Sequence, residues 1–435
     1  MDIRFQTKQV IKQAVQNVVL PVCYQMNRSR AVDPELVVFA DAHHNSRPAA
    51  MELLYHRLKR QGTFRIVEHY LDYGSAGAAA VAKHSMRFMQ LYASARYVVI
   101  CDNFLPVASC AKRKETKVIQ LWHACGCYKR FGYDAPDDIP KDYHGANVYR
   151  NADLVTVSGK AAVRPFASAM RLPEHCVQPI GVSRTDLYAR KAWRDRCRKQ
   201  FYEKYPLVEG ALEEALEEVS PNSCSSENKS SGNKNKKKVV LWAPTFRGNA
   251  GVPQLPSLDL NRLQMELGED YLVLACLHPH LLRAMKQGAG KQTGSMQAGI
   301  RNGETGDSYE PFEDFVCDIP TEELYPVADV LIADYSSLIY EYLLFQKPLV
   351  LYVPDLEAYR SRRGFYMEIE EIPGQIVKKE QELAAAVKQA VESSGKHAGR
   401  NGSPGDCAKL EKFLSTYMGA CDGKATERIA AWMTQ

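Results

Sequence analysis

Short runs rich in Val, Ile and Leu alternate along this chain with stretches of helical periodicity, and this alternation restricts the possible folds more than any other feature. The apolar runs are residues 36–42, 64–70, 97–102, 117–123 and 154–159 in the first half, and 239–244, 271–279, 315–320, 330–337 and 348–354 in the second. Helical patterns, such as those at 48–58 and 86–95, separate some of these runs. Buried strands that alternate with helices form parallel sheets covered on both faces. The sequence therefore predicts an α/β protein.

A polar segment interrupts the pattern near the middle of the chain. Residues 209–238 are acidic at first, then rich in Ser and Asn, and finally basic, which is typical of a disordered linker or a surface insertion. With 435 residues, the chain is long enough for two domains of ordinary size. We therefore expect two Rossmann-like domains, residues 31–208 and residues 239–435, the second ending in helices. Because such domains bind ligands at the C-terminal ends of their strands, the expected site is a cleft between the two halves.

Residues 1–30 form a segment of their own. Apolar side chains recur near helical spacing up to Leu20, with cations such as Arg4 and Lys8 among them, and Pro21 is expected to end this helix. Such an amphipathic helix either packs against its own domain or lies on an anionic membrane surface. The sequence leaves both alternatives open.

The overall composition adds a few further constraints. A net charge of +5 suits an anionic substrate or membrane surface, and it gives no reason to infer nucleic-acid binding. The chain has twelve scattered cysteines and lacks both a signal-peptide core and an apolar stretch long enough to cross a bilayer, so we expect a reduced, cytosolic protein. Cys125 and Cys127 are one close pair without a matching second pair, which is weak support for zinc. We therefore expect no bound metal and no cofactor.

The first candidate motif is the segment 120–132, where a predicted strand runs into a Gly-containing loop. His123 lies at the end of that strand, and a histidine with a pKa near neutrality accepts a proton from an attacking hydroxyl group. Lys129 and Arg130 add positive charge nearby, and Gln120 lies at the start of the motif. A lone histidine is more often a core residue, but the strand-end position and the adjacent cations favour a catalytic role for His123.

Two further motifs follow strands of the second half. Thr245 and Arg247 follow the strand that starts at residue 239. A guanidinium group can donate two hydrogen bonds at once to phosphate oxygens, which suits a diphosphate. His278 follows the next strand, and in its protonated form it would neutralise a leaving diphosphate. His278 and His280 also suggest a metal site, but Pro279 between them and the lack of a third ligand disfavour it.

The last motif joins a strand to a helix through two serines. Ser336 or Ser337 would cap the helix, whose free N–H groups then face an anion such as phosphate. Plain capping without a ligand is a strong alternative. Asp334 and Glu341 would contact ribose or alcohol hydroxyl groups. One capped turn is weak evidence, whereas four polar motifs at strand ends in two α/β halves are much stronger together.

At these residues the chain resembles the CDP-glycerol:polyglycerol-phosphate glycerophosphotransferase family, the teichoic acid primases and polymerases of Gram-positive bacteria. The resemblance covers most of residues 30–390, and many motifs agree in their order along the chain. The similar segments are 39–58, 86–106, the Trp-His motif at 120–133, the Gly-x-x-Arg-x-Asp segment within 177–188, the Ala-Pro-Thr-aromatic-Arg motif within 239–249, the His-Pro motif at 278–279, and 323–355.

The resemblance implies a GT-B-like fold, in which two Rossmann-like domains face each other across a cleft. It implies His123 as the general base, His278 at the donor phosphates, and Arg247 with the two serines on the diphosphate. Arg184, in the Gly-x-x-Arg-x-Asp segment, is expected to contact substrate as well. It further implies a peripheral location on the cytoplasmic face of the membrane, which favours the membrane alternative for the first helix.

The implied activity is transfer of glycerol phosphate from CDP-glycerol, or a related CDP-alcohol, to a hydroxyl group of a lipid-linked glycan or polyol-phosphate acceptor, with release of CMP. One alternative keeps the enzyme class and changes the donor to CDP-ribitol or to a nucleotide sugar. The other is a binding or assembly protein that has lost catalysis, although the presence of His123, Arg247 and His278 argues against it.

Overall fold

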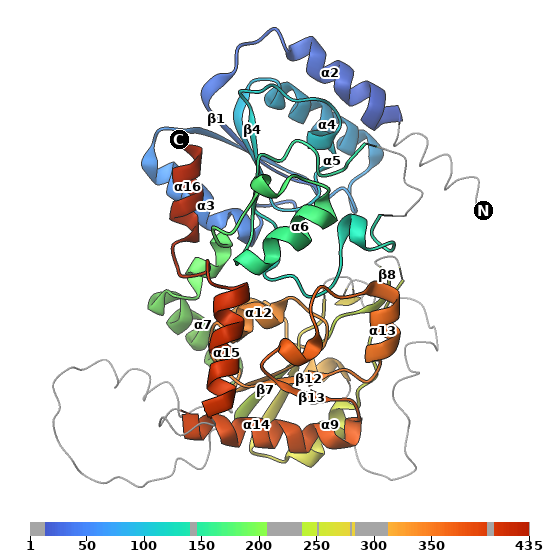
Figure 1. Ribbon diagram of the computed structural model, residues 1–435, viewed down its shortest axis with the longest axis vertical. Helices are drawn as coiled ribbons and strands as arrows, with labels where there is room; N and C mark the ends of the chain where they lie inside the picture. The colour runs from blue at the N-terminus through green and yellow to red at the C-terminus, as the bar shows by residue number, and fades with distance from the viewer. Residues whose placement is uncertain are drawn as a thin grey trace, which may run out of the picture. The chain divides into compact units, whose positions relative to one another are not determined.

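The computed structural model describes residues 14–139, 146–206, 237–249, 252–278, 281–282, 312–397 and 404–434. Its internal contacts divide the chain into two compact units: Met1–Ala189 with Ser415–Gln435, and Arg190–Leu414. Each unit contains its own parallel sheet with helices against it (Figure 1). The expected α/β class with two Rossmann-like halves is therefore confirmed.

The first unit is built on a six-stranded sheet in the order β2-β1-β3-β4-β5-β6, and every neighbouring pair is parallel. The strands are β1 (Asp33–Asp41), β2 (Arg65–Tyr70), β3 (Ala95–Ile100), β4 (Lys117–Gln120), β5 (Leu154–Thr156) and β6 (Val177–Gln178). The helices are α2 (Leu20–Asn27), preceded by a π-helical turn (Val15–Val19), α3 (Ala49–Gln61), α4 (Ala78–Tyr92), α5 (Leu105–Ala108), α6 (Val163–Met170) and α16 (Ala425–Met433). Short 3-10 turns cover Gly132–Asp134, Lys160–Ala162, Glu174–Cys176 and Ser183–Leu187.

Strand β1 shows why this sheet needs helices on both faces. Val38 and Ala40 belong to an apolar cluster with residues of α2 and α4, whereas Val37 and Phe39 belong to a second cluster with residues of α3 and α16. Successive side chains of a strand point to opposite faces, so an uninterrupted apolar run is buried only between two layers of helices. The apolar runs of the sequence thus follow from burial on both faces.

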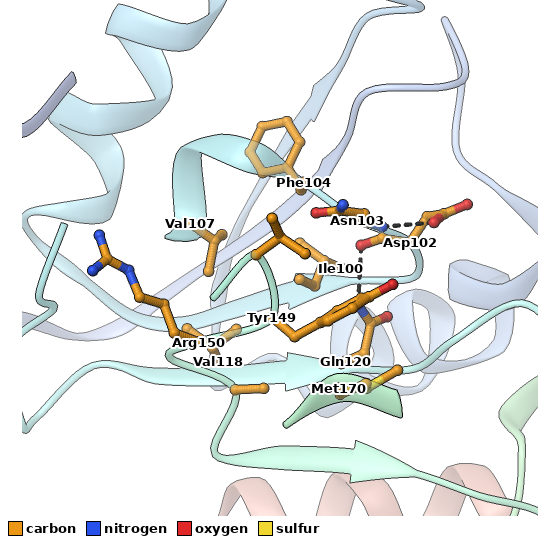
Figure 2. Close-up of a pocket in the computed structure, with 12 residues that line it drawn as sticks. Ile100, Asp102, Asn103, Phe104, Val107, Val118, Gln120, Tyr149, Arg150 and Met170 are labelled. Atoms are coloured by element: carbon orange, nitrogen blue, oxygen red, sulfur yellow. Dashed lines mark hydrogen bonds between the residues drawn. The ribbon is translucent and has the colours of Figure 1, made fainter. Parts of the chain in front are cut away.

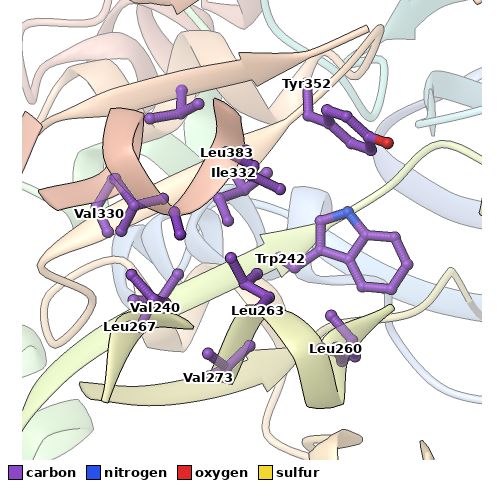
Figure 3. Close-up of a cluster of buried hydrophobic side chains, with 14 of the residues drawn as sticks. Val240, Trp242, Leu260, Leu263, Leu267, Val273, Val330, Ile332, Tyr352 and Leu383 are labelled. Atoms are coloured by element: carbon purple, nitrogen blue, oxygen red, sulfur yellow. The ribbon is translucent and has the colours of Figure 1, made fainter. Parts of the chain in front are cut away.

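The second unit repeats this plan with five parallel strands in the order β10-β7-β11-β12-β13. The strands are β7 (Lys238–Ala243), β10 (Tyr271–Ala275), β11 (Val330–Ala333), β12 (Leu349–Tyr352) and β13 (Gln375–Val377), with an antiparallel hairpin of β8 (Arg247–Asn249) and β9 (Val252–Gln254). The helices are α7 (Lys191–Lys204), α9 (Leu260–Leu267), α11 (Thr321–Leu324), α12 (Leu338–Leu343), α13 (Leu356–Arg363), α14 (Leu383–His397) and α15 (Pro404–Tyr417). Short 3-10 turns cover Phe312–Phe315, Ile369–Glu371 and Glu380–Glu382. Figure 3 shows Trp242, Leu263 and Leu383 in the core where α9 and α14 meet this sheet.

Both sheets have a switch point, a place where the connections from two adjacent strands leave in opposite directions. It lies between β1 and β3 in the first unit and between β7 and β11 in the second. In open α/β sheets, a crevice for ligands forms beyond the C-terminal ends of the strands at this point. The side chains that follow these four strands are therefore the first to consider as a functional site.

Two expectations about individual elements are wrong, and two short strands were not predicted. No strand forms over residues 315–320; a single bridge joins Val316 to Ala275 instead. The first helix does not end near Pro21 but continues to Asn27, because a π-helical turn precedes the proline and places it in the first turn of α2, where its missing N–H is tolerated. The short strands β6 and β13 have two and three residues, too few for a periodic pattern.

The unit boundaries also differ from the expected ones. Residues 415–435 belong to the first unit, because Ile429 and Met433 of α16 are buried in the cluster on β1. Helix α7 belongs to the second unit, where it contacts α11. Apolar periodicity reveals a helix but does not reveal which sheet it covers. Of the polar segment expected at 209–238, only its last two residues lie within the described residues.

The segment that resembles the Gly-x-x-Arg-x-Asp motif holds α16 in place. The backbone of Gly181 has φ = +93°, and a Cβ atom there would lie 2.2 Å from the carbonyl oxygen of Ala420. Asp186 is buried, and its carboxylate accepts hydrogen bonds from the backbone N–H groups of Ala425 (3.0 Å) and Thr426 (2.8 Å). Two orphan donors at the start of α16 are thus paired with a side chain that is distant in sequence.

Replacing Asp186 by Ala is expected to lower the free energy of unfolding by about 2–3 kcal/mol, because two buried N–H groups lose a charged acceptor. Urea unfolding of the full chain measures this loss. Glu427→Ala, on the same helix, removes an exposed ion pair with Arg57 and should cost less than about 1 kcal/mol. Equal losses in the two variants would show that the cap contributes nothing specific.

Candidate active site

His123 is carried out of the first sheet by an unusual turn after β4. The backbone of Trp122 is left-handed, with φ = +58°, and its N–H donates to Oε1 of Gln120 at 3.0 Å. The buried Trp122 ring stacks on the His123 ring with centroids 4.5 Å apart. Left-handed backbone is costly for a residue with a side chain, and such strain is concentrated at functional sites. The turn leaves 49% of the His123 side chain exposed.

Gln120 stabilises the backbone of the turn that carries His123. It is buried, and its Nε2 donates to the carbonyl oxygen of Asp102 at 2.9 Å while its Oε1 accepts from Trp122. Both ends of the amide are therefore bonded to backbone, where the sequence led us to expect contact with substrate. Gln120 is better described as a positioning residue for His123.

Asp102, which follows β3, orients the His123 ring. Oδ2 of Asp102 lies 3.3 Å from Nδ1 of His123, within ion-pair distance of a protonated ring, and the ring also hydrogen-bonds to the backbone of Cys101. Burial lowers the pKa of His123, and the charge of Asp102 opposes this shift. A histidine with a lowered pKa is neutral at pH 7 and can accept a proton.

Positive charge from two other loops also acts on His123. The charges of Arg184 and His43 lower its pKa further. Arg184 lies on the 3-10 turn Ser183–Leu187, and its charge acts on His123, so a shared site for these two residues stays a prediction. Lys129, by contrast, is half-buried in the loop after His123.

A second carboxylate and histidine lie at the switch point of the first sheet. Asp41 ends β1 and is buried, and its Oδ2 accepts from the backbone N–H groups of His43 (2.7 Å) and His44 (2.8 Å) and lies 2.9 Å from Nδ1 of His44. The thiol of Cys101 donates to Oδ1 of Asp41 at 3.7 Å, and burial raises the pKa of that thiol. Sequence reasoning missed Asp41, His44 and Asp102, although each lies at or just after the end of a strand.

In the second unit, Thr245 and Asp334 meet at the switch point between β7 and β11. The backbone N–H of Thr245 donates to Oδ1 of Asp334 at 2.9 Å, and both residues are buried. The hydroxyl oxygen of Thr245 is buried and has no hydrogen-bond partner within the described ranges of the chain. These two expected site residues are therefore brought together.

Arg247 is held by two carboxylates. Its Nε and Nη2 donate to Asp355 at 2.7 and 2.9 Å, and its Nη1 donates to Asp334 at 2.9 Å and to the carbonyl oxygen of Thr245 at 2.6 Å. Burial disfavours the charge, but the hydrogen bond to Asp355 and the charge of Asp334 raise the pKa of Arg247. Four of its five N–H donors are occupied, so the structure gives little support to the expected diphosphate contact. Arg247 instead neutralises two carboxylates.

An aromatic stack completes the surroundings of Arg247. The rings of Tyr335 and Tyr359 stack with centroids 3.9 Å apart, and the guanidinium carbon lies 4.9 and 5.2 Å from the two centroids. The hydroxyl of Tyr335 donates to Asp355 at 2.9 Å. Sequence reasoning missed Asp355, Tyr335 and Tyr359, because their contacts with Arg247 join segments that are far apart in the sequence.

The remaining expected residues lie around this group. Ser336 and Ser337 are half-buried at the start of α12, where the N–H of Leu338 approaches the Ser336 hydroxyl at 3.4 Å and the Ser337 side chain makes no capping bond. Glu341 is buried within α12. His278 is exposed after β10, and its ring centroid lies 5.0 Å from that of Phe246, between Thr245 and Arg247 in the sequence. Pro279 and His280 lie outside the described residues.

Comparison with known proteins gives one consistent result. A family model described as CDP-glycerol:poly(glycerophosphate) glycerophosphotransferase matches residues 22–212 and 214–434. The teichoic acid ribitol-phosphate primase of Bacillus spizizenii is 30% identical over 395 residues, which cover 88% of this chain and 86% of that protein. The teichoic acid poly(ribitol-phosphate) polymerase of the same organism is 28% identical over 346 residues, 76% of this chain but only 45% of the polymerase.

A solved structure shows the same fold. The wall teichoic acid polymerase TagF aligns over 100% of this chain and 98% of its own chain, with a TM-score of 0.63 and 20% sequence identity. A TagF variant soaked with CDPG aligns with a TM-score of 0.65. Likeness at this level of identity concerns the fold, and it agrees with the two parallel α/β sheets described above.

Proposed function

This chain belongs to the CDP-glycerol:poly(glycerophosphate) glycerophosphotransferase family, and on that premise we propose that it transfers glycerol phosphate from CDP-glycerol to an acceptor hydroxyl group, releasing CMP. The acceptor would be a lipid-linked glycan or polyol phosphate of the teichoic acid type. The main support for the proposal is the family match, which covers both units. In addition, His123 lies at a strand end, next to the carboxylate of Asp102.

The proposed reaction begins when Nε2 of His123 accepts the proton of the acceptor hydroxyl group. The oxygen then attacks the β-phosphorus of the donor, and the bond from this phosphorus to the oxygen that bridges to the α-phosphorus breaks. CMP leaves with that oxygen, and the acceptor gains glycerol phosphate through a phosphodiester bond. Such transfers depend mainly on positioning and on neutralising charge, so one oriented base is sufficient protein chemistry.

We assign the donor to residues of the second unit. A protonated His278 would neutralise the charge that develops on the leaving phosphate. Thr245, Ser336 and Ser337 would offer hydroxyl groups to the diphosphate, and the buried Thr245 hydroxyl supports this because it has no partner among the described residues. Asp334 and Glu341 remain proposals for contacts with donor hydroxyl groups. Arg247 would act indirectly, by keeping Asp334 in place.

Ribitol phosphate is the second candidate for the transferred group, because the relative with 30% identity is a ribitol-phosphate primase. The deciding experiment gives the full chain CDP-glycerol, CDP-ribitol and UDP-sugars in separate reactions and measures nucleotide release. CMP release with CDP-glycerol is expected. A higher kcat/KM with CDP-ribitol would reassign the donor, and turnover of a UDP-sugar alone would overturn the proposal. No release with any donor would favour a binding protein.

We propose a peripheral location on the cytoplasmic face of the membrane, and an apolar stripe on the first helical segment supports contact with a membrane surface. Val18, Val22 and Met26, spaced four residues apart, are 59%, 52% and 76% exposed, whereas Leu20 and Tyr24 are buried on the opposite side. Arg28 follows the helix directly and adds positive charge. An apolar stripe beside cations is typical of helices that lie in a membrane interface. None of the helices in the described ranges is both long and apolar enough to span a bilayer.

Replacing Val22 and Met26 by Glu together is expected to weaken binding to vesicles by at least about tenfold, because two apolar side chains no longer enter the interface. Cosedimentation with vesicles that contain phosphatidylglycerol measures this change. Met265→Glu is the matched control, because Met265 is 59% exposed on α9 of the second unit. An equal loss in the control, or no loss in the double variant, would contradict a membrane role for this stripe.

A further inference from the structure

A second pair of a histidine and a carboxylate follows β1, the strand next to β3. Asp41 ends β1, and its Oδ2 lies 2.9 Å from Nδ1 of His44. Strands β1 and β3 are parallel neighbours, and open α/β sheets bind ligands beyond the switch point between such strands. The His44 side chain is 55% exposed there. This pair is therefore in a position to contact a ligand, and no step of the proposed reaction uses it.

Asp41 holds the His44 ring in one tautomer. Its Oδ2 also accepts from the backbone N–H groups of His43 and His44, and its Oδ1 accepts from the thiol of Cys101. A carboxylate surrounded by such donors is ionised and only accepts hydrogen bonds, so Nδ1 of His44 carries a proton. Nε2 of His44 makes no hydrogen bond to any residue that the structure describes. It is an acceptor in the neutral ring and becomes a donor in the protonated ring.

Cys101 and Asp102 connect this pair to the proposed general base. The thiol of Cys101 donates to Asp41 at 3.7 Å, and the backbone of Cys101 hydrogen-bonds to the His123 ring. Asp102, the next residue, lies beside His123 and accepts a hydrogen bond from Gln120 at its carbonyl oxygen (Figure 2). Neighbouring strands are about 4.8 Å apart. The two pairs therefore follow adjacent strands at the same edge of the sheet.

The charges around these histidines suit an anion. His43 is exposed, and its charge and that of Arg184 both act on His123. The Asp41 side chain is only 1% exposed, so its own charge lies behind the imidazole that it holds. An imidazole between a buried carboxylate and a phosphate is stabilised in its protonated form. Its Nε2–H group then donates a charge-assisted hydrogen bond to a phosphate oxygen.

We propose that His44, protonated on both ring nitrogens, binds the acceptor phosphate that is nearest to the attacking hydroxyl group. This assignment rests on the proposed function, which places that hydroxyl group beside His123. In a glycerol phosphate unit, three carbon atoms separate the terminal hydroxyl oxygen from the phosphate ester oxygen, a length that suits two neighbouring strand ends. The attacking hydroxyl group gives its proton to His123, and His44 takes no part in that transfer. His44 would thus favour acceptors that already end in a polyol phosphate over a bare glycan.

The test uses His44→Gln, which keeps a polar side chain and removes the charge. The probe is a diester in which one phosphate joins two glycerol units, and its binding to the full chain is measured by calorimetry without donor. The variant should weaken this binding about tenfold, the equivalent of one charge-assisted hydrogen bond, and raise the KM for the diester equally. The kcat and the KM for CDP-glycerol should not change. His56→Gln is the matched control, because His56 also pairs with a carboxylate and is 50% exposed.

A second variant and a second probe separate charge from shape. His44→Lys keeps a positive charge and should bind the diester within about threefold of wild type. Diglycerol, in which an ether oxygen replaces the phosphate, should bind equally to wild type and to His44→Gln. If His44→Lys binds the diester as weakly as His44→Gln does, or if diglycerol binding falls as much as diester binding, then His44 does not recognise phosphate charge and the assignment is wrong.

Two further outcomes decide between the sources of the phosphate and between this assignment and the proposed function. Unchanged diester binding in His44→Gln would overturn the assignment, and an accompanying rise in the KM for CDP-glycerol would place the donor phosphate at His44 instead. Diester binding that depends on His44, without CMP release from any donor, would contradict the proposed function and leave the phosphate site in place.

Discussion

Replacing His123 by Ala is expected to reduce CMP release about a thousandfold. General base catalysis contributes factors of this size, and Asp102 and Trp122 hold the His123 ring in one orientation. The measurement is kcat for CMP release by the full chain with CDP-glycerol and acceptor. His56→Ala is the matched control, since His56 is an exposed histidine of the same unit that pairs with Glu52. Turnover at the wild-type rate in His123→Ala would remove His123 from the mechanism.

The partner variant Asp102→Asn adds a signed pH dependence. The wild-type pKa of His123 lies below its ordinary value of about 6.5, because burial lowers it more than Asp102 raises it. The activity should therefore fall with acidification only below this ordinary value, as the imidazole becomes protonated. Removing the Asp102 charge lowers the pKa further, so the acid limb of the kcat/KM profile should move to lower pH while the rate decreases. A shift to higher pH would contradict the assigned pair.

Replacing Arg247 by Ala is expected to lower the free energy of unfolding by about 3–5 kcal/mol, the usual cost of removing one member of a buried ion pair. Asp334 would be left as a buried charge, with 5% of its side chain exposed, and Asp355 would lose its bidentate partner. Burial works to raise the pKa of Asp355, but the Arg247 hydrogen bond lowers it overall. Without Arg247 this pKa rises, so protonation relieves part of the penalty. The stability deficit of the variant should therefore shrink as the pH falls toward 4.

Urea unfolding at several pH values measures this effect, and two further variants define its cause. Arg360→Ala removes a partly exposed ion pair with Glu368 in the same unit and should cost less than about 1 kcal/mol. The double variant Arg247→Ala with Asp355→Ala should be less destabilised than the sum of the single changes, because the two residues interact directly. If Arg247→Ala is as stable as Arg360→Ala but has a raised KM for CDP-glycerol, then Arg247 serves the donor, as the sequence alone suggested.

The outcome at Arg247 illustrates where sequence reasoning reaches its limit. The motif correctly places an arginine after β7, next to the switch point of the second sheet. The carboxylate that occupies two of its donors, Asp355, lies 108 residues further along the chain. A guanidinium group has only five N–H donors, and whether any remain for a ligand depends on partners that no local pattern reveals.

The alternation of apolar runs and helices, the feature that most restricts this fold, was determined by the sequence alone. It predicts the parallel sheets because a strand buried on both faces must be apolar throughout. The order of motifs also indicated the family, and the place of His123 at the end of a strand predicted its catalytic role. These properties are local, since periodicity and strand ends are defined by residues that are neighbours in the chain.

Only the tertiary structure decided which strand ends lie side by side. It paired Asp102 with His123, assigned α16 to the first unit, and turned Gln120 from a substrate contact into the support of the His123 turn. The physical reason is that hydrogen bonds and burial are shared between segments that are distant in sequence. The chemistry available to a side chain therefore depends on which of its own donors and acceptors remain unbound after folding.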